Sequence, residues 1–335
     1  MKFRAGPLIA ACVLALAACG QERGGEAPAA GTSEVPAAEQ SREALRAAQQ
    51  KLYDEALAVA EASQGDGAPA VWKMSDEDTT IYFMGTVHLL KPDLDWRSDE
   101  IDAAFEAADT LVFETDISSE AAAADMMRFI SQRGMFSDGR QLTSLLNEAE
   151  KAELEAALTA LNLPLGAVQP MRPWFAAVNL SVQQIQMEGF DPNSGVEQVL
   201  EAEGRADGKS FAYLETIDEQ LGRFADLPDP EQVDFLVSTV ESVEEGTEVL
   251  DVLVSEWADG DVTGIGVLMA NPDMMGSEAV YEALLNGRNE DWVPKIEAML
   301  DDPGTVLIAV GAGHLAGEDS VIEKLRAKGH VVEGP

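Results

Sequence analysis

The spacing of apolar and polar positions divides residues 70–335 into alternating strands and helices. Short apolar runs bounded by turn residues predict six strands, over 70–74, 80–84, 110–113, 211–214, 305–310 and 330–332. Apolar residues at helical spacing predict helices over 98–108, 119–185 with breaks at 134–139 and 163–166, 231–269, 277–300 and 318–328. This alternation is typical of the α/β class. We expect a sheet built from the N- and C-terminal segments, with a large, mostly helical insertion between them.

The pattern before residue 70 is different and predicts a secreted protein with a lipid anchor. Lys2 and Arg4 precede an apolar stretch, 7–18, that is too short to span a bilayer and ends in small residues. The junction Leu16-Ala17-Ala18-Cys19 is similar to a bacterial lipobox. We therefore expect residues 1–18 to be a signal peptide and Cys19 to be lipidated. The alternative is an ordinary signal peptide followed by a chance cysteine.

Two further segments separate this junction from the main domain. Residues 19–40 are mainly Gly, Ala, Pro, Glu, Ser and Gln, which cannot bury enough apolar surface to fold, so they predict a disordered tether. Alanine and leucine recur at helical spacing over 41–64 and predict one amphipathic helix. The compact domain is expected over 70–335.

Composition restricts the chemistry and the partners. The only other cysteine, Cys12, leaves with the signal peptide, so disulfides, a cysteine nucleophile and a cysteine metal site are excluded from the mature protein. The net charge of −39 repels the phosphate backbone of nucleic acids. A field of this sign also raises the local cation concentration, which gives weak support to a metal ion. An acidic surface that keeps the protein soluble is the simpler interpretation.

Four of the predicted strands are followed by a side chain that can bind metal or transfer protons. Two of the three histidines, His88 and His314, end a Gly-x-x-His segment directly after a strand. Two other strands are followed by Glu114 and Glu215. If these strands are parallel neighbours, the four side chains meet at one edge of the sheet, where α/β proteins place their sites.

Two imidazoles with one or two carboxylates suit zinc, manganese, cobalt or iron. A metal in such a site activates water, and a nearby glutamate can take the proton during attack on a carbonyl group, as in hydrolases. A structural interpretation is open as well: glycine ends many strands, each histidine could cap a helix, and charged residues often flank strands. The third histidine, His330, lacks the motif and is expected at the surface.

The order of several short motifs resembles that of the TraB/GumN/Tiki family over about residues 70–335. The motifs are Gly85-Thr86-Val87-His88, Leu111-Val112-Phe113-Glu114, Arg172-Pro173-Trp174, Leu214-Glu215-Thr216 with Glu219-Gln220, Arg288-Asn289 with Trp292, and Val310-Gly311-Ala312-Gly313-His314-Leu315 with Gly317. The resemblance implies a Tiki/erythromycin-esterase-like fold. One departure is Gly195-Val196-Glu197, where the family usually has Gly-Val-Asp; the longer side chain argues against a tight role for Glu197.

The resemblance also implies an activity, because animal Tiki members are membrane-tethered, metal-dependent proteases. It assigns the metal, which we expect to be Mn, Co or Zn, to His88, His314 and Glu114. Glu215 is then a fourth ligand or the general base, with Glu114 the other catalytic carboxylate. Arg288 and Asn289 could hold a substrate carboxylate or carbonyl group, or could be a surface pair beside the core residue Trp292. Trp174 is expected to be a packing residue.

The leading hypothesis is a lipid-anchored metallohydrolase of the bacterial cell envelope that acts on peptides or unstructured segments. It would be attached to the membrane, in the outer membrane facing the periplasm, by the lipid on Cys19. Two alternatives stay open on the sequence alone: a protein that binds and sequesters a peptide signal without cleaving it, and a metal-dependent esterase. The sequence does not separate peptide from ester hydrolysis, because one activated water could attack the carbonyl group of either substrate.

Overall fold

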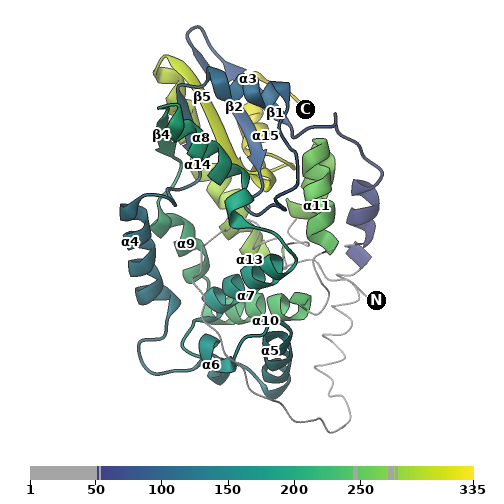
Figure 1. Cartoon of the computed structure of the whole chain (residues 1–335), viewed down its shortest axis with the longest axis vertical. Helices are drawn as coiled ribbons and strands as arrows, with labels where there is room; N and C mark the ends of the chain where they lie inside the picture. The colour runs from purple at the N-terminus through teal and green to yellow at the C-terminus, as the bar shows by residue number, and fades with distance from the viewer. Residues whose placement is uncertain (1–50, 53, 244–247, 271–274, 276–277) are drawn as a thin grey trace.

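The computed structural model describes residues 51–335, apart from 53, 244–247, 271–274 and 276–277 (Figure 1). The expected signal peptide, lipidated Cys19 and tether lie outside the described residues, as does the first part, 41–50, of the predicted helix over 41–64. Residues 54–60 are helical, and Ala60 is buried against the main domain. Among the residues that the structure describes, no helix has the length and apolar character needed to cross a membrane.

One six-stranded sheet forms the centre of the domain, and the prediction of an α/β fold is confirmed. Its spatial order is β4-β3-β5-β2-β1-β6. The strands are β1 (Val71–Ser75), β2 (Thr79–Thr86), β3 (Thr110–Phe113), β4 (Ser210–Tyr213), β5 (Gly304–Gly311) and β6 (Val332–Glu333). Strands from the two ends of the chain thus lie side by side, as the sequence predicts.

The pairing of the strands decides where the motifs meet. β4, β3, β5 and β2 are parallel to one another, whereas β1 is antiparallel to both β2 and β6. The two strands that precede the Gly-x-x-His histidines, β2 and β5, pair directly, with Thr86 opposite Gly311. The carboxyl ends of four neighbouring strands therefore share one edge of the sheet.

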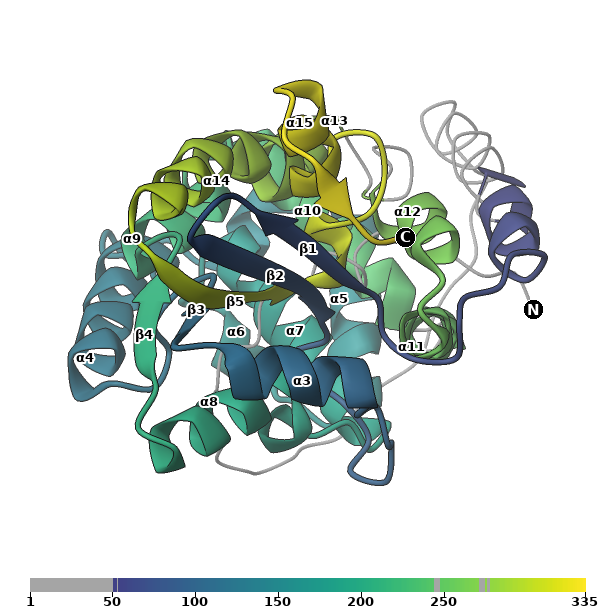
Figure 2. The ribbon, with the colours of Figure 1, turned by 90° about the horizontal axis from the view of Figure 1, so that it is seen from above.

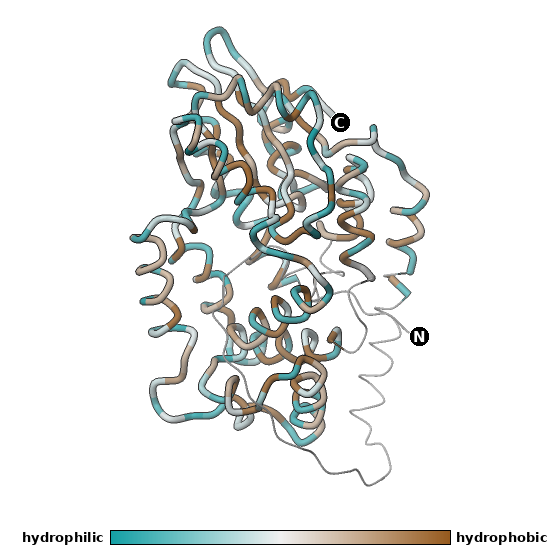
Figure 3. The backbone as a smooth tube through the Cα atoms, viewed as in Figure 1, coloured by the Kyte–Doolittle hydropathy of each residue, from teal (hydrophilic) through white to brown (hydrophobic). Residues whose placement is uncertain are grey.

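Helices cover both faces of the sheet (Figure 2). On one face, α3 (Asp99–Ala107) and α8 (Val196–Ala206) share a core with apolar residues of β3 and β5. On the other face, α14 (Gly287–Ala298) and α15 (Val321–Ala327) do the same. Figure 3 shows the hydrophobic residues running along the strands between these layers. Beside the sheet stand α11 (Glu248–Asp259) and α12 (Val262–Met269), which share the core of α3 and α8.

The inserted segments form a helical lobe next to the carboxyl edge of the sheet (Figure 1). Its helices are α4 (Glu120–Phe129), α5 (Glu148–Ala160), α6 (Leu165–Val168), α7 (Pro173–Met187), α9 (Ile217–Ala225), α10 (Asp229–Val243) and α13 (Glu278–Tyr281). They share a core of their own, in which Trp174 is fully buried. The expectation that Trp174 is a packing residue is confirmed. Its indole N–H donates to the carbonyl of Arg133 at 3.1 Å.

Element boundaries differ from the predictions mainly inside the insertions. The predicted helix over 231–269 is divided into α10, α11 and α12, with Gly260, at a φ of 77°, between the last two. The predicted closing helix begins at Val321, three residues later than expected, because Ser320 is its N-cap. Ser98 caps α3 as predicted, accepting from the N–H of Ile101 at 3.2 Å.

Two helix glycines predict opposite effects of the same substitution. A Cβ at Gly204, in α8, would lie 2.5 Å from Leu111 Cδ1 and 3.2 Å from Phe211 Cζ, whereas one at Gly222, in α9, would meet only Asp226 Oδ2 at 3.6 Å. Gly204→Ala should lower the free energy of unfolding by about 1–3 kcal/mol through overpacking. Gly222→Ala should raise it by up to about 1 kcal/mol through helix propensity. Urea denaturation measures both, and a Gly204→Ala variant as stable as Gly222→Ala would contradict the packing argument.

Candidate functional site

The four predicted site residues meet at the carboxyl edge of the sheet. In the spatial order of the strands, Glu215 follows β4, Glu114 follows β3, His314 ends a 3-10 turn after β5, and His88 follows β2. Glu114, Glu215 and His314 are buried, with 4%, 7% and 0% of their surface exposed. The sequence-based expectation that these side chains converge is therefore supported by the topology.

Gly311 marks the point that three of these side chains face. A Cβ built on Gly311 would lie 3.1 Å from Glu114 Oε1, 3.6 Å from His314 Cδ2 and 3.8 Å from His88 Nε2. The N–H of Gly311 donates to Glu114 Oε1 at 2.8 Å. A side chain at position 311 would fill this space, so glycine keeps it open.

The glycine of the first motif serves the close approach of the two motifs. A Cβ on Gly85 would lie 3.0 Å from the Cα of Ala312. Neither Gly85 nor Gly311 has a positive φ. Gly85 is therefore required by the close approach of the segment at Ala312, and Gly311 by the side chains that surround it; neither is required by an unusual backbone conformation.

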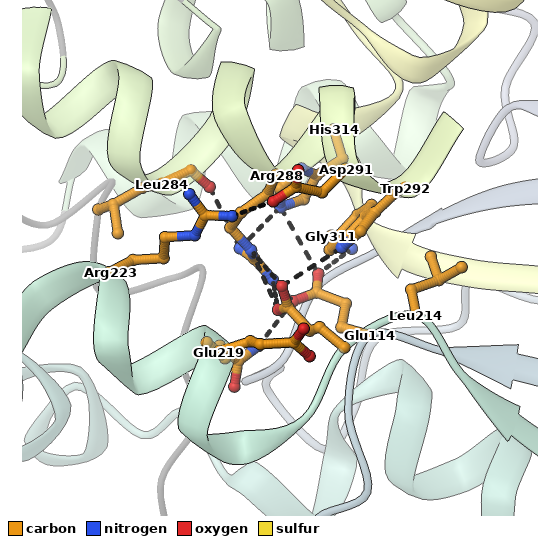
Figure 4. A network of polar contacts seen from close by, with 12 residues as sticks. Glu114, Leu214, Glu219, Arg223, Leu284, Arg288, Asp291, Trp292, Gly311 and His314 are labelled. Carbon is orange, nitrogen blue, oxygen red and sulfur yellow. Dashed lines mark hydrogen bonds and ion pairs between the residues drawn. The ribbon is translucent and has the colours of Figure 1, made fainter. Parts of the chain in front are cut away.

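Arg288, on α14, is the central cation of the site (Figure 4). It is 1% exposed, and its Nη2 lies 2.5 Å from both Glu114 Oε2 and Glu215 Oε1. Its Nε donates to Glu215, and its Nη1 contacts the carbonyl of Leu284 at 3.2 Å and His314 Nε2 at 3.0 Å. These contacts engage the five donors of the guanidinium group.

The buried charges shift the acidities of the two carboxyl groups in opposite directions. Burial by itself disfavours the charged form of Glu114. The charge of Arg288, together with the two histidines and the N–H of Gly311, outweighs burial and lowers the pKa of this carboxyl to about 2. Burial raises the pKa of Glu215 above its ordinary value, although Arg288 acts against the shift. Glu114 is held further by Gln220, whose side-chain amide donates to Oε2 at 3.0 Å.

His314 is held as a neutral imidazole. Its Nδ1 lies 2.6 Å from Asn289 Oδ1, an oxygen that only accepts, so the proton is on Nδ1 and Nε2 accepts from Arg288. Burial and the charge of Arg288 lower its pKa well below the ordinary value. The Trp292 ring packs against the imidazole with centroids 4.3 Å apart, and its N–H faces Glu215 Oε2 at 3.3 Å.

His88 is oriented by a different group. Its Nδ1 lies 2.6 Å from Glu197 Oε1, whereas its buried Nε2 has no hydrogen-bond partner within the described part of the chain. Burial disfavours the imidazolium form, but Glu197 outweighs it and raises the pKa of His88 to about 9. The expectation that the longer Glu197 side chain argues against a tight role is not met, because its carboxylate contacts both His88 and Thr86.

The side chains around Gly311 offer a nitrogen and oxygen donor set of the kind that Mn, Co and Zn bind in proteins. His88 Nε2 is without a partner among the described residues, and His314 Nε2 lies 3.8 Å from Glu114 Oε1. As the side chains stand, no group of three His, Cys, Asp or Glu among the described residues has metal-binding geometry. Arg288 Nη1 donates a hydrogen bond to His314 Nε2. A metal ion can bind this nitrogen only after Arg288 Nη1 has moved away from it.

The sequence analysis also singled out Arg288, Asn289 and His330. Arg288 and Asn289 are both buried beside Trp292, and their polar atoms contact protein groups, with the Asn289 amide N–H donating to the carbonyl of Asp319 at 2.9 Å. Their assignment to substrate stays a prediction. His330 lies away from the site and pairs with Glu297 at 2.9 Å.

Sequence analysis did not assign Glu197 or Gln220 to the site. Gln220 lies in a motif that the resemblance includes, one residue after the Thr216–Glu219 capping box that starts α9 directly behind Glu215. Capping fixes the start of this helix and so the direction of Gln220. A capping box directly after a glutamate at a strand end is the sequence signal that could have identified Gln220.

Cavities lie on two sides of the site. One is lined by apolar side chains of α11 and α12, among them Leu253, Ile265 and Met269, and by the segment 311–314. The other is an open, more polar cleft between the start of α4 and the start of α9, and Glu215 and Lys295 are among the residues that line it. The site is therefore adjacent to an apolar surface near His314 and to a polar surface near Glu215.

Comparison with known proteins identifies the family. A sequence model of the TraB/PrgY/gumN family matches residues 70–334. The chain belongs to the TraB/PrgY/gumN family. It is similar to the uncharacterized protein YbaP of Escherichia coli strain K12, with 24% identity over 247 residues, which cover 73% of this chain and 88% of that protein. YbaP of Shigella flexneri is 24% identical over 246 residues, 73% of this chain and 87% of the relative. No solved structure matches.

Removal of Arg288 should destabilise the fold strongly. Arg288→Met would leave Glu114 and Glu215 as neighbouring buried carboxylates without their cation, and the loss of one partner from a buried ion pair costs about 3–5 kcal/mol. Arg223→Met is the matched control, since Arg223 is partly exposed and pairs with Asp291 near the surface. It should cost less than about 1 kcal/mol. Chemical denaturation compares the two variants, and equal stabilities of Arg288→Met and Arg223→Met would contradict the central role of Arg288.

The stabilising effect of Glu114 should depend on pH. Because the folded state holds its pKa at about 2, below the usual 4.5, ionised Glu114 stabilises the fold fully above pH 4.5. This contribution is lost as pH falls towards 2. Glu114→Gln should therefore be less stable than the wild type at pH 7, by a margin that shrinks between pH 4.5 and 3 in urea denaturation. A margin that grows on acidification would contradict the assignment.

Proposed function

We propose that this protein is a metal-dependent hydrolase that cleaves peptides or unstructured protein segments. The observation that carries the proposal is the convergence of His88, His314 and Glu114 on the open space beside Gly311, with the buried His88 Nε2 lacking a partner among the described residues. A buried polar atom without a partner is costly, which favours a ligand at that point.

His88, His314 and Glu114 would hold a divalent ion, which we propose to be Mn, Co or Zn. Each of the three is supported by a second group: Glu197 behind His88, Asn289 behind His314, and the Gly311 N–H with Gln220 at Glu114. Such support orients metal ligands and is a general feature of metal sites. When bound, the ion would lower the pKa of a water molecule and supply a nucleophile near neutral pH.

Glu215 is the proposed general base. Glu215 lines the open cleft between α4 and α9, and its raised pKa suits a group that takes a proton. Arg288 links it to Glu114, with Nη2 at 2.5 Å from an oxygen of each. A shift of Arg288 away from these carboxylates would leave its donors free to bind a substrate carbonyl or carboxylate group, with Asn289 beside it.

Peptides are the proposed substrates because the open cleft beside Glu215 has the volume of a ligand site. This cleft measures about 560 Å³, and its charged and polar lining can accept the backbone groups of a peptide. We also propose that lipidation of Cys19 anchors the protein in the cell envelope, facing the periplasm. This location would bring peptides and membrane-proximal segments within reach of the site.

Metal content tests the proposed ligands. We expect the purified wild type, loaded with Mn, Co or Zn and desalted, to retain about one ion per chain by mass spectrometry. His88→Ala and His314→Ala should each retain less than about a tenth of that amount, because a site with two remaining ligands binds weakly. His330→Ala is the control with unchanged content, since His330 pairs with Glu297 outside the site. Wild-type metal content in both site variants would refute the assignment.

A substrate assay separates hydrolysis from binding. The metal-loaded wild type, the His330→Ala variant and the His88→Ala variant are incubated with a peptide library and with simple esters, and products are identified by mass spectrometry. We expect peptide cleavage by the first two and a loss of at least about 100-fold in the third. Saturable binding with intact peptides would indicate sequestration instead, and cleavage of esters alone would indicate an esterase.

A further inference from the structure

The segment that leads into α8 packs closely along the first histidine motif. Asp191 forms a bridge with Leu90, its N–H donating to the Leu90 carbonyl at 2.9 Å. The N–H of Val196 donates to the carbonyl of Val87 at 3.1 Å. Two backbone contacts, several residues apart, therefore fix the start of α8 relative to the motif.

Gly195 makes this contact possible. A Cβ at this position would lie 2.1 Å from the carbonyl oxygen of His88, a distance that no side chain tolerates. Because the glycine allows backbone to meet backbone, the first turn of α8 starts directly beside the His88 ring. Glu197, the second residue of α8, is 8% exposed at this place.

The Glu197 carboxylate is shared by two groups of the motif. Its Oε1 lies 2.6 Å from His88 Nδ1 and also accepts the hydroxyl of Thr86, the last residue of β2. With Nδ1 engaged in this way, Nε2 is the ring nitrogen that lies towards Gly311 and Glu114. The second histidine has a neutral amide, Asn289, in the equivalent role.

We propose that Glu197 is a positioning residue that fixes the ring of His88 and strengthens Nε2 as a metal donor. The part that concerns metal rests on the function proposed above, whereas the orientation of the ring does not. A carboxylate that accepts from the distal nitrogen of a histidine sets its tautomer and raises its basicity, and losing such a partner typically weakens metal binding 10–100-fold. Glu197 would thus affect the metal without touching it.

The orientation is tested by NMR on metal-free protein labelled with ¹⁵N-histidine. The protein has three histidines, so His88→Ala, His314→Ala and His330→Ala assign the spectrum. We expect a downfield, exchange-protected Nδ1–H signal from His88 in the wild type and its loss in Glu197→Ala. Glu197→Gln keeps an acceptor at the same reach, so its signal should persist at a changed shift.

Glu201→Ala is the matched control. Glu201 lies one turn further along α8 and is also buried, but it binds Ser118 and Arg205 instead of the motif. This variant should leave the His88 signal unchanged. Loss of the signal in both variants would indicate general disruption of α8 and would overturn a specific role for Glu197.

The metal part is tested by chelator competition with Co²⁺ and Mn²⁺, together with thermal melting of the metal-free proteins. We expect Kd to rise 10–100-fold in Glu197→Ala, to be partly restored in Glu197→Gln, and to be unchanged in Glu201→Ala. Equal metal affinities of Glu197→Ala and Glu201→Ala would overturn the proposed effect of Glu197 on metal binding. Should the wild type bind no metal, the proposed function fails, while the NMR signals still decide whether Glu197 orients His88.

Discussion

The Arg288 guanidinium group between two buried carboxylates is the interaction on which the site depends. Glu114 and Glu215 follow neighbouring parallel strands, so their side chains are forced close together in an interior that water does not screen. Without a cation their mutual repulsion and desolvation would oppose the pairing of β3 and β4. Arg288, from a helix far along the chain, offsets this cost and also contacts His314.

The same network joins the two parts of the molecule. α14, which carries Arg288 and Trp292, packs on the sheet, whereas Gln220 belongs to α9 of the helical lobe and donates to Glu114. The site thus lies at the boundary between the sheet and the lobe, flanked by an apolar cavity and by a polar cleft. Such boundaries are common positions for ligand sites because they are concave and contain groups from several elements.

Each histidine has its own supporting group, and the difference has chemical consequences. Asn289 supports a neutral His314, since its amide oxygen fixes the tautomer without adding charge. Glu197 supports His88 with a full negative charge and raises its pKa to about 9. A metal ion would take the place of a proton on His88 Nε2, whereas on His314 it would replace the contact with Arg288.

The sequence by itself determined the α/β class, the strands that carry the two Gly-x-x-His segments, and the four residues that follow strands at the site. Local periodicity and turn residues specify the elements, and neighbouring parallel strands end at one edge of the sheet. Tertiary structure alone decided which groups each of these four side chains contacts. Arg288 lies 73 residues from Glu215 and Glu197 lies 111 residues from Thr86 along the chain. Such contacts depend on how helices pack on the sheet, and no local pattern records that packing.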